Sequence, residues 1–204
     1  ELDTESVVLL WQTEKSLVKY LDMRDGKVSF YLDKAVSDDD SEESTNKVKE
    51  GNALIGAYDK EGKLIWSWHI WVTNGDPREE TITLNGEEMM NRNLGAFTNS
   101  NGSTDGAEIF RSYGMYYQWG NKNPFVGPQR YNFPGNHDDI LYDNKEYNVY
   151  LEYEASSAKV GSLEWSIANP MALIKGNKDN DYDWLFEGHD NTLWSEDTKT
   201  DNDP

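Results

Sequence analysis

The chain has 204 residues, enough for one large domain or two small ones with a substantial core. Its formal net charge of −19 disfavours nucleic acid and anionic lipid as partners, because both repel an acidic surface. It has no Cys, which excludes disulfides and thiol chemistry in this chain, and no apolar run near the length of about 20 residues that crosses a bilayer. The aromatic content of 13% predicts a folded chain with an aromatic core.

The first part of the chain, residues 1–73, is predicted to be an antiparallel β-sandwich. Residues 6–12 are an apolar, β-branched run that is typical of a strand. Asp25-Gly26 separates two alternating runs, which is the strongest short-range signal for a hairpin. Residues 37–47 are acidic and predict a solvated loop, with a cation site as the alternative. Asp59–Gly62 then predicts the turn of a second hairpin.

The strand after this turn has three Trp residues within Lys63–Val72. Alternation gives one face a wholly apolar set of side chains, which is typical of a strand that faces a core. This set consists of Leu64, Trp66, Trp68, Ile70 and Val72. Trp66 and Trp68 are therefore predicted to be core residues, with a ligand platform as the alternative. On the mixed opposite face, His69 and Trp71 are expected at an interface with the residues that follow.

Residues 74–204 are predicted to form a loop-rich α+β domain, so the fold class is mainly β with an α+β second domain. The polar, Gly- and Pro-containing stretch 73–80 is the predicted boundary. Asn85-Gly86 signals another hairpin, and residues 146–154 alternate as in a strand. Residues 169–176 begin with Asn-Pro and end in Gly, which predicts a short helix.

One Gly-, Asn- and aromatic-rich stretch contains five candidate ligand-binding residues. Sugar rings stack on aromatic faces, and amide groups can meet sugar hydroxyls. The candidates are Tyr116, Tyr117, Trp119, Asn121 and Asn123. The alternative is that these aromatic residues pack beneath the loop and hold it in place.

Asp179, Asp181 and Asp183 alternate as at the start of an EF-hand loop, which makes Ca²⁺ a candidate cofactor. That loop also needs Gly at its sixth position and Glu at its twelfth, and this chain has Trp184 and Asp190 there. A solvated acidic loop is therefore the alternative. The three His residues lack zinc-ligand spacing, and neither a nucleophile elbow nor a phosphate loop occurs, so no catalytic residue is predicted.

Five sequence blocks carry a family resemblance over about residues 51–204. In chain order they are GKLIWSWHIWVTNGDP, MNRNLGA, GMYYQWGNKNPF, SIANPMALI and DWLFEGHDNTLW. Together they resemble surface and fimbria-associated (fimbrillin-type) proteins of Bacteroidales, related to the major paralogous domain first noted in Fibrobacter. The resemblance implies an exported protein at the cell surface or outer membrane, or secreted, with a C-type-lectin-like second domain.

The chain departs from this family pattern in two places. Asn91 stands where the family usually has Asp, which puts any role of a carboxylate there in doubt. The chain also stops at Pro204, before the usual Cys-Pro block. The lectin-like domain is therefore expected to be incomplete.

These observations predict a non-enzymatic protein of adhesion or recognition that binds a surface glycan. One alternative is a structural subunit of a fimbria or envelope assembly, which would bind other protein subunits through an exposed strand edge. Another is a glycan hydrolase, because folding could bring a pair of the many carboxylates together.

Overall fold

The structure is a computed structural model that describes residues 2–35, 47–126 and 152–194. Within these ranges the chain is mainly β, as predicted, with short helices. The predicted acidic loop, apart from Lys47, lies outside the described residues, as does the predicted strand 146–154 before Glu152.

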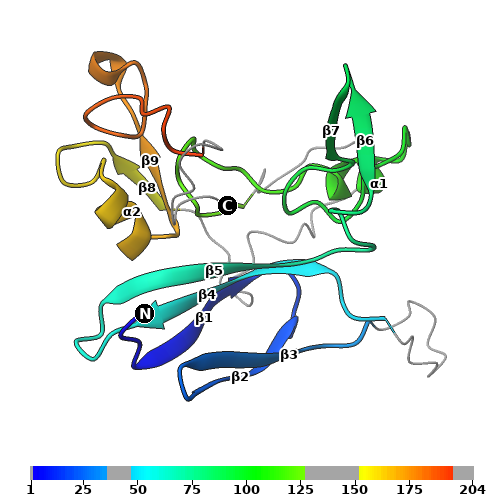
Figure 1. The fold of residues 1–204 in the computed structure, drawn as a ribbon, viewed down its shortest axis with the longest axis horizontal. Coiled ribbons are helices and arrows are strands. Elements are labelled where there is room, and N and C mark those ends of the chain that lie inside the picture. Colours follow the sequence, from blue (N-terminus) through cyan, green and yellow to red (C-terminus); the bar gives the residue numbers. More distant parts are fainter. Residues whose placement is uncertain (1, 36–46, 127–151, 195–204) are drawn as a thin grey trace.

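The centre of the molecule is a three-stranded antiparallel sheet. It consists of β1 (Ser6–Gln12), β4 (Gly51–Tyr58) and β5 (Leu64–Val72), with β4 in the middle (Figure 1). The central position of β4 explains its almost continuous burial, because both faces and both edges are covered. The predicted turn between β4 and β5 is confirmed: the Asp59 carboxylate accepts the N–H groups of Glu61 and Lys63.

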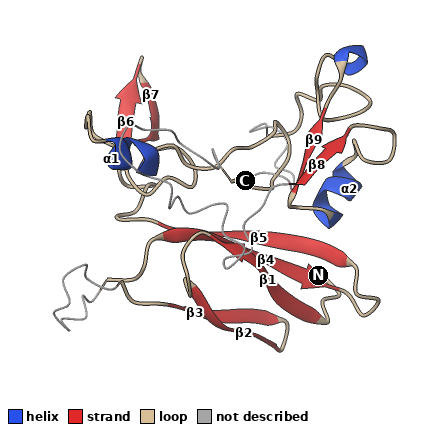
Figure 2. Cartoon of the chain, turned by 180° about the vertical axis from the view of Figure 1, so that it is seen from behind, coloured by secondary structure: helices blue, strands red, loops and turns tan. Residues whose placement is uncertain are grey.

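A separate hairpin covers one face of this sheet. It consists of β2 (Val18–Arg24) and β3 (Lys27–Leu32), and both views show it on the same side (Figures 1 and 2). Its turn has Asp25 at φ 52° and Gly26 at φ 69°, the paired positive values that an Asp-Gly hairpin turn adopts. The hairpin and the sheet enclose one core cluster. Its buried members are Leu17, Val18, Ala53, Ile55 and Val72.

The Trp-rich strand β5 divides its side chains between two layers. Trp68 and Ile70 pack against the core cluster under the hairpin. Trp66 and Trp68 are half-buried rather than fully buried, because β5 lies at the edge of the sheet. On the opposite face, the His69 ring contacts Tyr117, and the Trp71 indole N–H donates to the Ala96 carbonyl at 3.0 Å. The predicted interface role of His69 and Trp71 is therefore confirmed.

The other described residues after β5 lie on that opposite face in two groups (Figure 2). In the first group, β6 (Thr81–Leu84) and β7 (Glu87–Met90) form the predicted hairpin around Asn85-Gly86, and α1 (Gly106–Arg111) follows. The Asp105 carboxylate caps α1 by accepting two backbone N–H groups.

The second group joins two parallel strands through a helix. β8 (Glu152–Ala155) pairs with β9 (Ala172–Lys175), and α2 (Leu163–Ala168) connects them. A 3₁₀ turn follows at Lys178–Asn180.

The predicted helix over 169–176 is wrong. The helix comes earlier, where Ser162 caps it by accepting the Trp165 N–H, and Asn169 ends it. Ala172 and Ile174 are buried on one face of the strand that follows. Pairing with β8 and burial of these side chains outweigh the local helix signal of Asn-Pro.

A second core cluster joins the sheet to the later residues. Its buried members are Trp11, Leu54, Phe110, Met115 and Val126. The two parts of the chain therefore share a core, and their division into domains at residue 73 stays a prediction.

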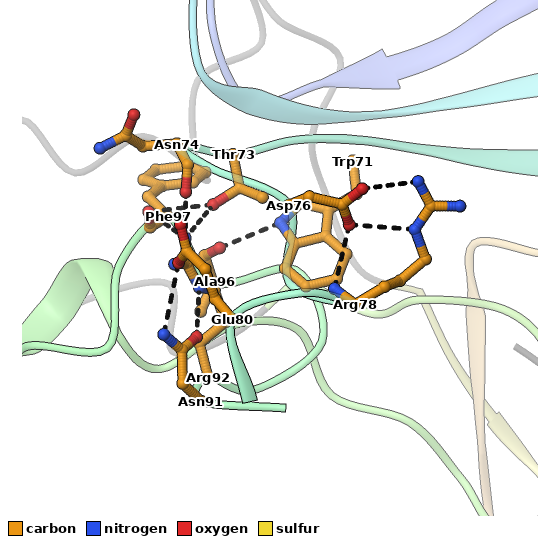
Figure 3. A network of polar contacts seen from close by, with 10 residues as sticks. All are labelled: Trp71, Thr73, Asn74, Asp76, Arg78, Glu80, Asn91, Arg92, Ala96 and Phe97. Carbon is orange, nitrogen blue, oxygen red and sulfur yellow. Dashed lines mark hydrogen bonds and ion pairs between the residues drawn. The ribbon is translucent and has the colours of Figure 1, made fainter. Parts of the chain in front are cut away.

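Arg92 holds the connection that leaves β5 (Figure 3). Its side chain is only 5% exposed and donates to the Thr73 hydroxyl and the Asn74 carbonyl, both at 2.7 Å. It also pairs with the Glu80 carboxylate, which accepts the amide of Asn91 at 3.3 Å. Thr73 and Asn74 belong to one block of the family resemblance and Arg92 to the next, so these two blocks are in contact. Position 91 has Asn where the family usually has Asp, and Glu80 supplies the carboxylate that pairs with Arg92.

Candidate ligand-binding site

A hollow of about 700 Å³ lies between Trp119 and the segment 179–189; we call it the Trp119 hollow. It is lined by Gln118, Trp119, Asp179, Asn180, Asp181, Tyr182, Asp183, Trp184, Phe186, Glu187, Gly188 and His189. One predicted sugar-binding residue and all three predicted calcium ligands therefore line the same hollow, although the sequence separates them by about sixty residues.

Trp119 is a fixed and half-exposed ring. The Gln118 side chain docks this loop on β9, because it donates to the Ile174 carbonyl at 2.7 Å and accepts the Ile174 N–H at 3.2 Å. The Trp119 indole N–H donates to the Asp190 carbonyl at 3.1 Å, and the Trp119 carbonyl accepts the Trp184 indole N–H at 2.6 Å. With 45% of Trp119 exposed, part of a held aromatic surface remains open to solvent.

Two further exposed aromatic side chains, Tyr182 and Phe186, line the hollow. Tyr182 is 72% exposed and Phe186 is 44% exposed. Asp181 and Tyr182 have φ values of 53° and 62°, in the left-handed region that costs about 1 kcal/mol or more for such residues. Strained backbone of this kind is concentrated at ligand sites, where it holds a side chain in a position that an unstrained turn would not give.

The His189 imidazole stacks against the Trp119 ring. The His189 Nδ1 lies 2.8 Å from the Asp183 carboxylate, and its Nε2 lies 2.9 Å from the side-chain oxygen of Asn191. The hydrogen bonds to Asp183 and Asn191 raise the pKa of His189, because both acceptors favour the protonated ring. The imidazole stacks on Trp119 with centroids 6.1 Å apart and an interplanar angle of 29°.

The three aspartates do not converge as calcium ligands. In the ranges that the structure describes, no three His, Asp or Glu side chains are grouped so that they could hold a metal ion. Asp183 already accepts from His189 and from the Leu185 N–H. Asp179 lies on a 3₁₀ turn and Asp181 is the left-handed residue after it, so the alternating spacing does not bring the carboxylates to one point.

Tyr116 and Tyr117 lie apart from the Trp119 hollow. Tyr116 is exposed, and its backbone pairs with Phe125. Tyr117 is half-buried against the central sheet, where its hydroxyl donates to the Nδ1 of His69 at 3.1 Å. Only Trp119 of the three predicted aromatic residues therefore lines this hollow.

Asn121 and Asn123 are buried and hold the loop in place, which corrects their predicted contact with sugar hydroxyls. Asn123 donates to the Ser166 carbonyl at 2.9 Å and accepts the Ser67 hydroxyl at 3.2 Å. The Asn121 side-chain oxygen accepts the Asn123 N–H at 3.1 Å. Both residues are 1% exposed, and the Asn123 amide connects the loop to β5 and α2.

Lys122 lies between these two asparagines without an acidic partner among the described residues. Its ammonium group donates to the Ser67 carbonyl and hydroxyl, at 3.0 and 2.6 Å, and lies 4.3 Å from the centroid of the Trp66 ring. Burial lowers the pKa of Lys122 to about 8. These contacts anchor the segment that follows Trp119.

The sequence places any binding surface in the loops 113–139 or 176–190, and the second range contains three lining residues that it does not single out, Tyr182, Phe186 and His189. Tyr182 lies between two aspartates in an otherwise polar run, and an aromatic residue without apolar neighbours is a usable sign of exposure.

No family model, curated protein or solved structure matches the chain. The resemblance to fimbria-associated proteins therefore stays a prediction. In the part of the chain that the structure describes, neither helix has the length or the apolar character needed to cross a bilayer.

Proposed function

We propose that this chain is an exported cell-surface recognition protein that binds a glycan in the Trp119 hollow. In this proposal, residues 1–73 are a β-sandwich module that supports a lectin-like second part. The observation that carries the proposal is the fixed, half-exposed indole of Trp119 on the wall of a cavity with many polar groups. The C–H face of a sugar ring packs on such a surface, and the polar groups around it give orientation.

Carboxylates supply those polar groups. Asp179, Asp181 and Glu187 line the hollow, and none of them has a side-chain hydrogen bond or ion pair within the described residues. An ionised carboxylate accepts hydrogen bonds at both oxygens, so these groups are free to accept sugar hydroxyls.

A glycan array with the full chain tests the proposal, in calcium and then in chelator. We expect binding that Trp119→Ala abolishes. Tyr31→Ala is the matched control, because Tyr31 is 70% exposed on β3, on the other side of the sheet. Near-ultraviolet circular dichroism checks that both variants are folded.

The other outcomes of this experiment point to other functions of the chain. Full retention of binding in Trp119→Ala, or no bound glycan at all, would overturn the proposal. Loss of binding in chelator would support a calcium cofactor. Release of shorter sugars in the same mixtures would favour the hydrolase.

A second candidate function is structural, and a groove of about 490 Å³ favours it. The groove lies between the β2–β3 hairpin and the sheet, and its lining includes Leu2, Met23, Val28, Phe30, Trp68 and Ile70. An apolar side chain of a second copy would bury apolar surface there. Sedimentation velocity should then show concentration-dependent association that Phe30→Ser reduces, and a monomer at all concentrations would remove this candidate.

A further inference from the structure

We propose that the glycan bound in the Trp119 hollow carries a free, protonated amine, as in an amino sugar that is not acetylated. This inference rests on the proposed function and names the class of its ligand. It starts from a cavity with three partly exposed aromatic side chains, Trp119, Tyr182 and Phe186.

The walls of this cavity already place a titratable ring between an aromatic face and an acid. His189 lies on the face of Trp119 and donates to the Asp183 carboxylate at 2.8 Å. In its protonated form this ring is a cation between an aromatic face and a carboxylate. A ligand ammonium group uses the same two attractions, the quadrupole of the ring and the charge of a carboxylate.

The remaining charges of the lining have one sign. Asp179, Asp181 and Glu187 line the hollow, and no Lys or Arg side chain is among the described residues that line it. A carboxylated or sulfated sugar would be repelled, and an acetylated amino sugar would leave these charges unpaired. A protonated amine on the sugar ring gives them a partner.

The shape favours a ring over a linear amine. A cavity of about 700 Å³ lies in the usual size range of small-ligand sites and exceeds the space that a single lysine side chain would fill. Flat aromatic faces also contact a pyranose ring over more area than an extended methylene chain.

Isothermal titration calorimetry with three trimers tests the proposal on the full chain. The probes are the β-1,4 trimer of glucosamine, the acetylated trimer with the same rings, and trilysine. At physiological salt, and at a pH where the amines are protonated, we expect the glucosamine trimer to bind about tenfold tighter than the acetylated one. Raising the pH until the amines are neutral should remove that preference.

Matched charge variants locate the effect. Asp181→Asn combined with Glu187→Gln should bring the ratio of the two affinities close to one. The control, Glu87→Gln combined with Glu88→Gln, removes the same charge from β7, in the other group of elements (Figure 1), and should leave the ratio unchanged. Trp119→Ala should weaken both trimers without a change of net charge.

The outcomes separate this inference from the proposed function. Equal affinity for both sugar trimers would overturn the inference and leave glycan binding in place. Binding of other glycans on the array but of neither trimer would do the same. No glycan binding at all would overturn both. Trilysine that binds as tightly as the glucosamine trimer would overturn the sugar as ligand, and an equal loss in the Glu87–Glu88 control would overturn the site.

Discussion

Acid is expected to destabilise the fold through His69, which lies between the central sheet and the later residues. Its Nε2–H donates to the side-chain oxygen of Asn52 at 2.9 Å, and its Nδ1 accepts the Tyr117 hydroxyl at 3.1 Å. The Asn52 amide nitrogen is engaged with the Gly95 carbonyl at 2.9 Å, which fixes the acceptor toward the ring. The site therefore suits a neutral imidazole, and burial lowers the pKa of His69 to about 4.

The sign and size of the effect follow from this lowered pKa. Above the unfolded pKa of 6.5 the ring is neutral in both states, and the free energy of unfolding does not depend on its titration. As the pH falls from 6.5 toward about 4, the unfolded chain binds a proton that the folded chain does not. At about 1.4 kcal/mol for each pH unit, the loss of stability is at most about 3 kcal/mol.

Urea unfolding of the wild type and of His69→Gln, at pH values between about 4 and 7, measures this loss. Gln keeps a donor for Asn52 and does not titrate, so carboxylate titration cancels in the difference between the two proteins. We expect the wild type to lose stability relative to the variant as the pH falls. A constant difference across this range would refute the reasoning, as would an NMR titration in which the His69 ring protonates near its usual pKa.

Three further predictions concern the supports of the fold. In the wild type, the free energy of unfolding should rise by about 2 kcal/mol between about pH 8 and 10, because only the unfolded chain keeps the Lys122 proton there. Lys122→Met should abolish this rise. A rise that persists in the variant would contradict the burial of that charge. Asp105→Ala should lower the free energy of unfolding by about 1 kcal/mol, and Asp105→Ser should restore most of this loss, because Ser also caps a helix. An unchanged free energy of unfolding in Asp105→Ala would show that the cap on α1 contributes nothing. Gly176→Ala should cost about 2 kcal/mol or more and weaken glycan binding, because a Cβ there would collide with the backbone of Tyr182, which lines the Trp119 hollow. Gly62→Ala is its control and should cost only about 1 kcal/mol, since Gly62 has φ 77° and open space around it; equal losses would refute the collision.

The hairpins could be predicted because their signals lie within a few residues of each other. Asp25-Gly26 and Asn85-Gly86 adopt positive φ, as the turn chemistry requires. The helix expected after Asn169 failed for the opposite reason. Residues 172–175 pair with β8, and that contact overrides a local preference.

The candidate site also depends on long-range contacts that the sequence does not show. An aromatic residue looks alike in sequence whether it is exposed, as Trp119 is, or packed against a neighbouring layer, as Tyr117 is. Asn121 and Asn123 are polar, yet the long-range partners of Asn123, on β5 and α2, draw them into the interior.

The sequence by itself determined the acidic charge, the absence of thiol chemistry, the mainly β class and the turns, since these depend on composition and on neighbours in the chain. Only the tertiary structure decided that Trp119 and Tyr182 line one hollow and that His69 lies between Asn52 and Tyr117. Such features need side chains from distant segments at a defined separation, and packing sets that separation after the strands and loops have assembled.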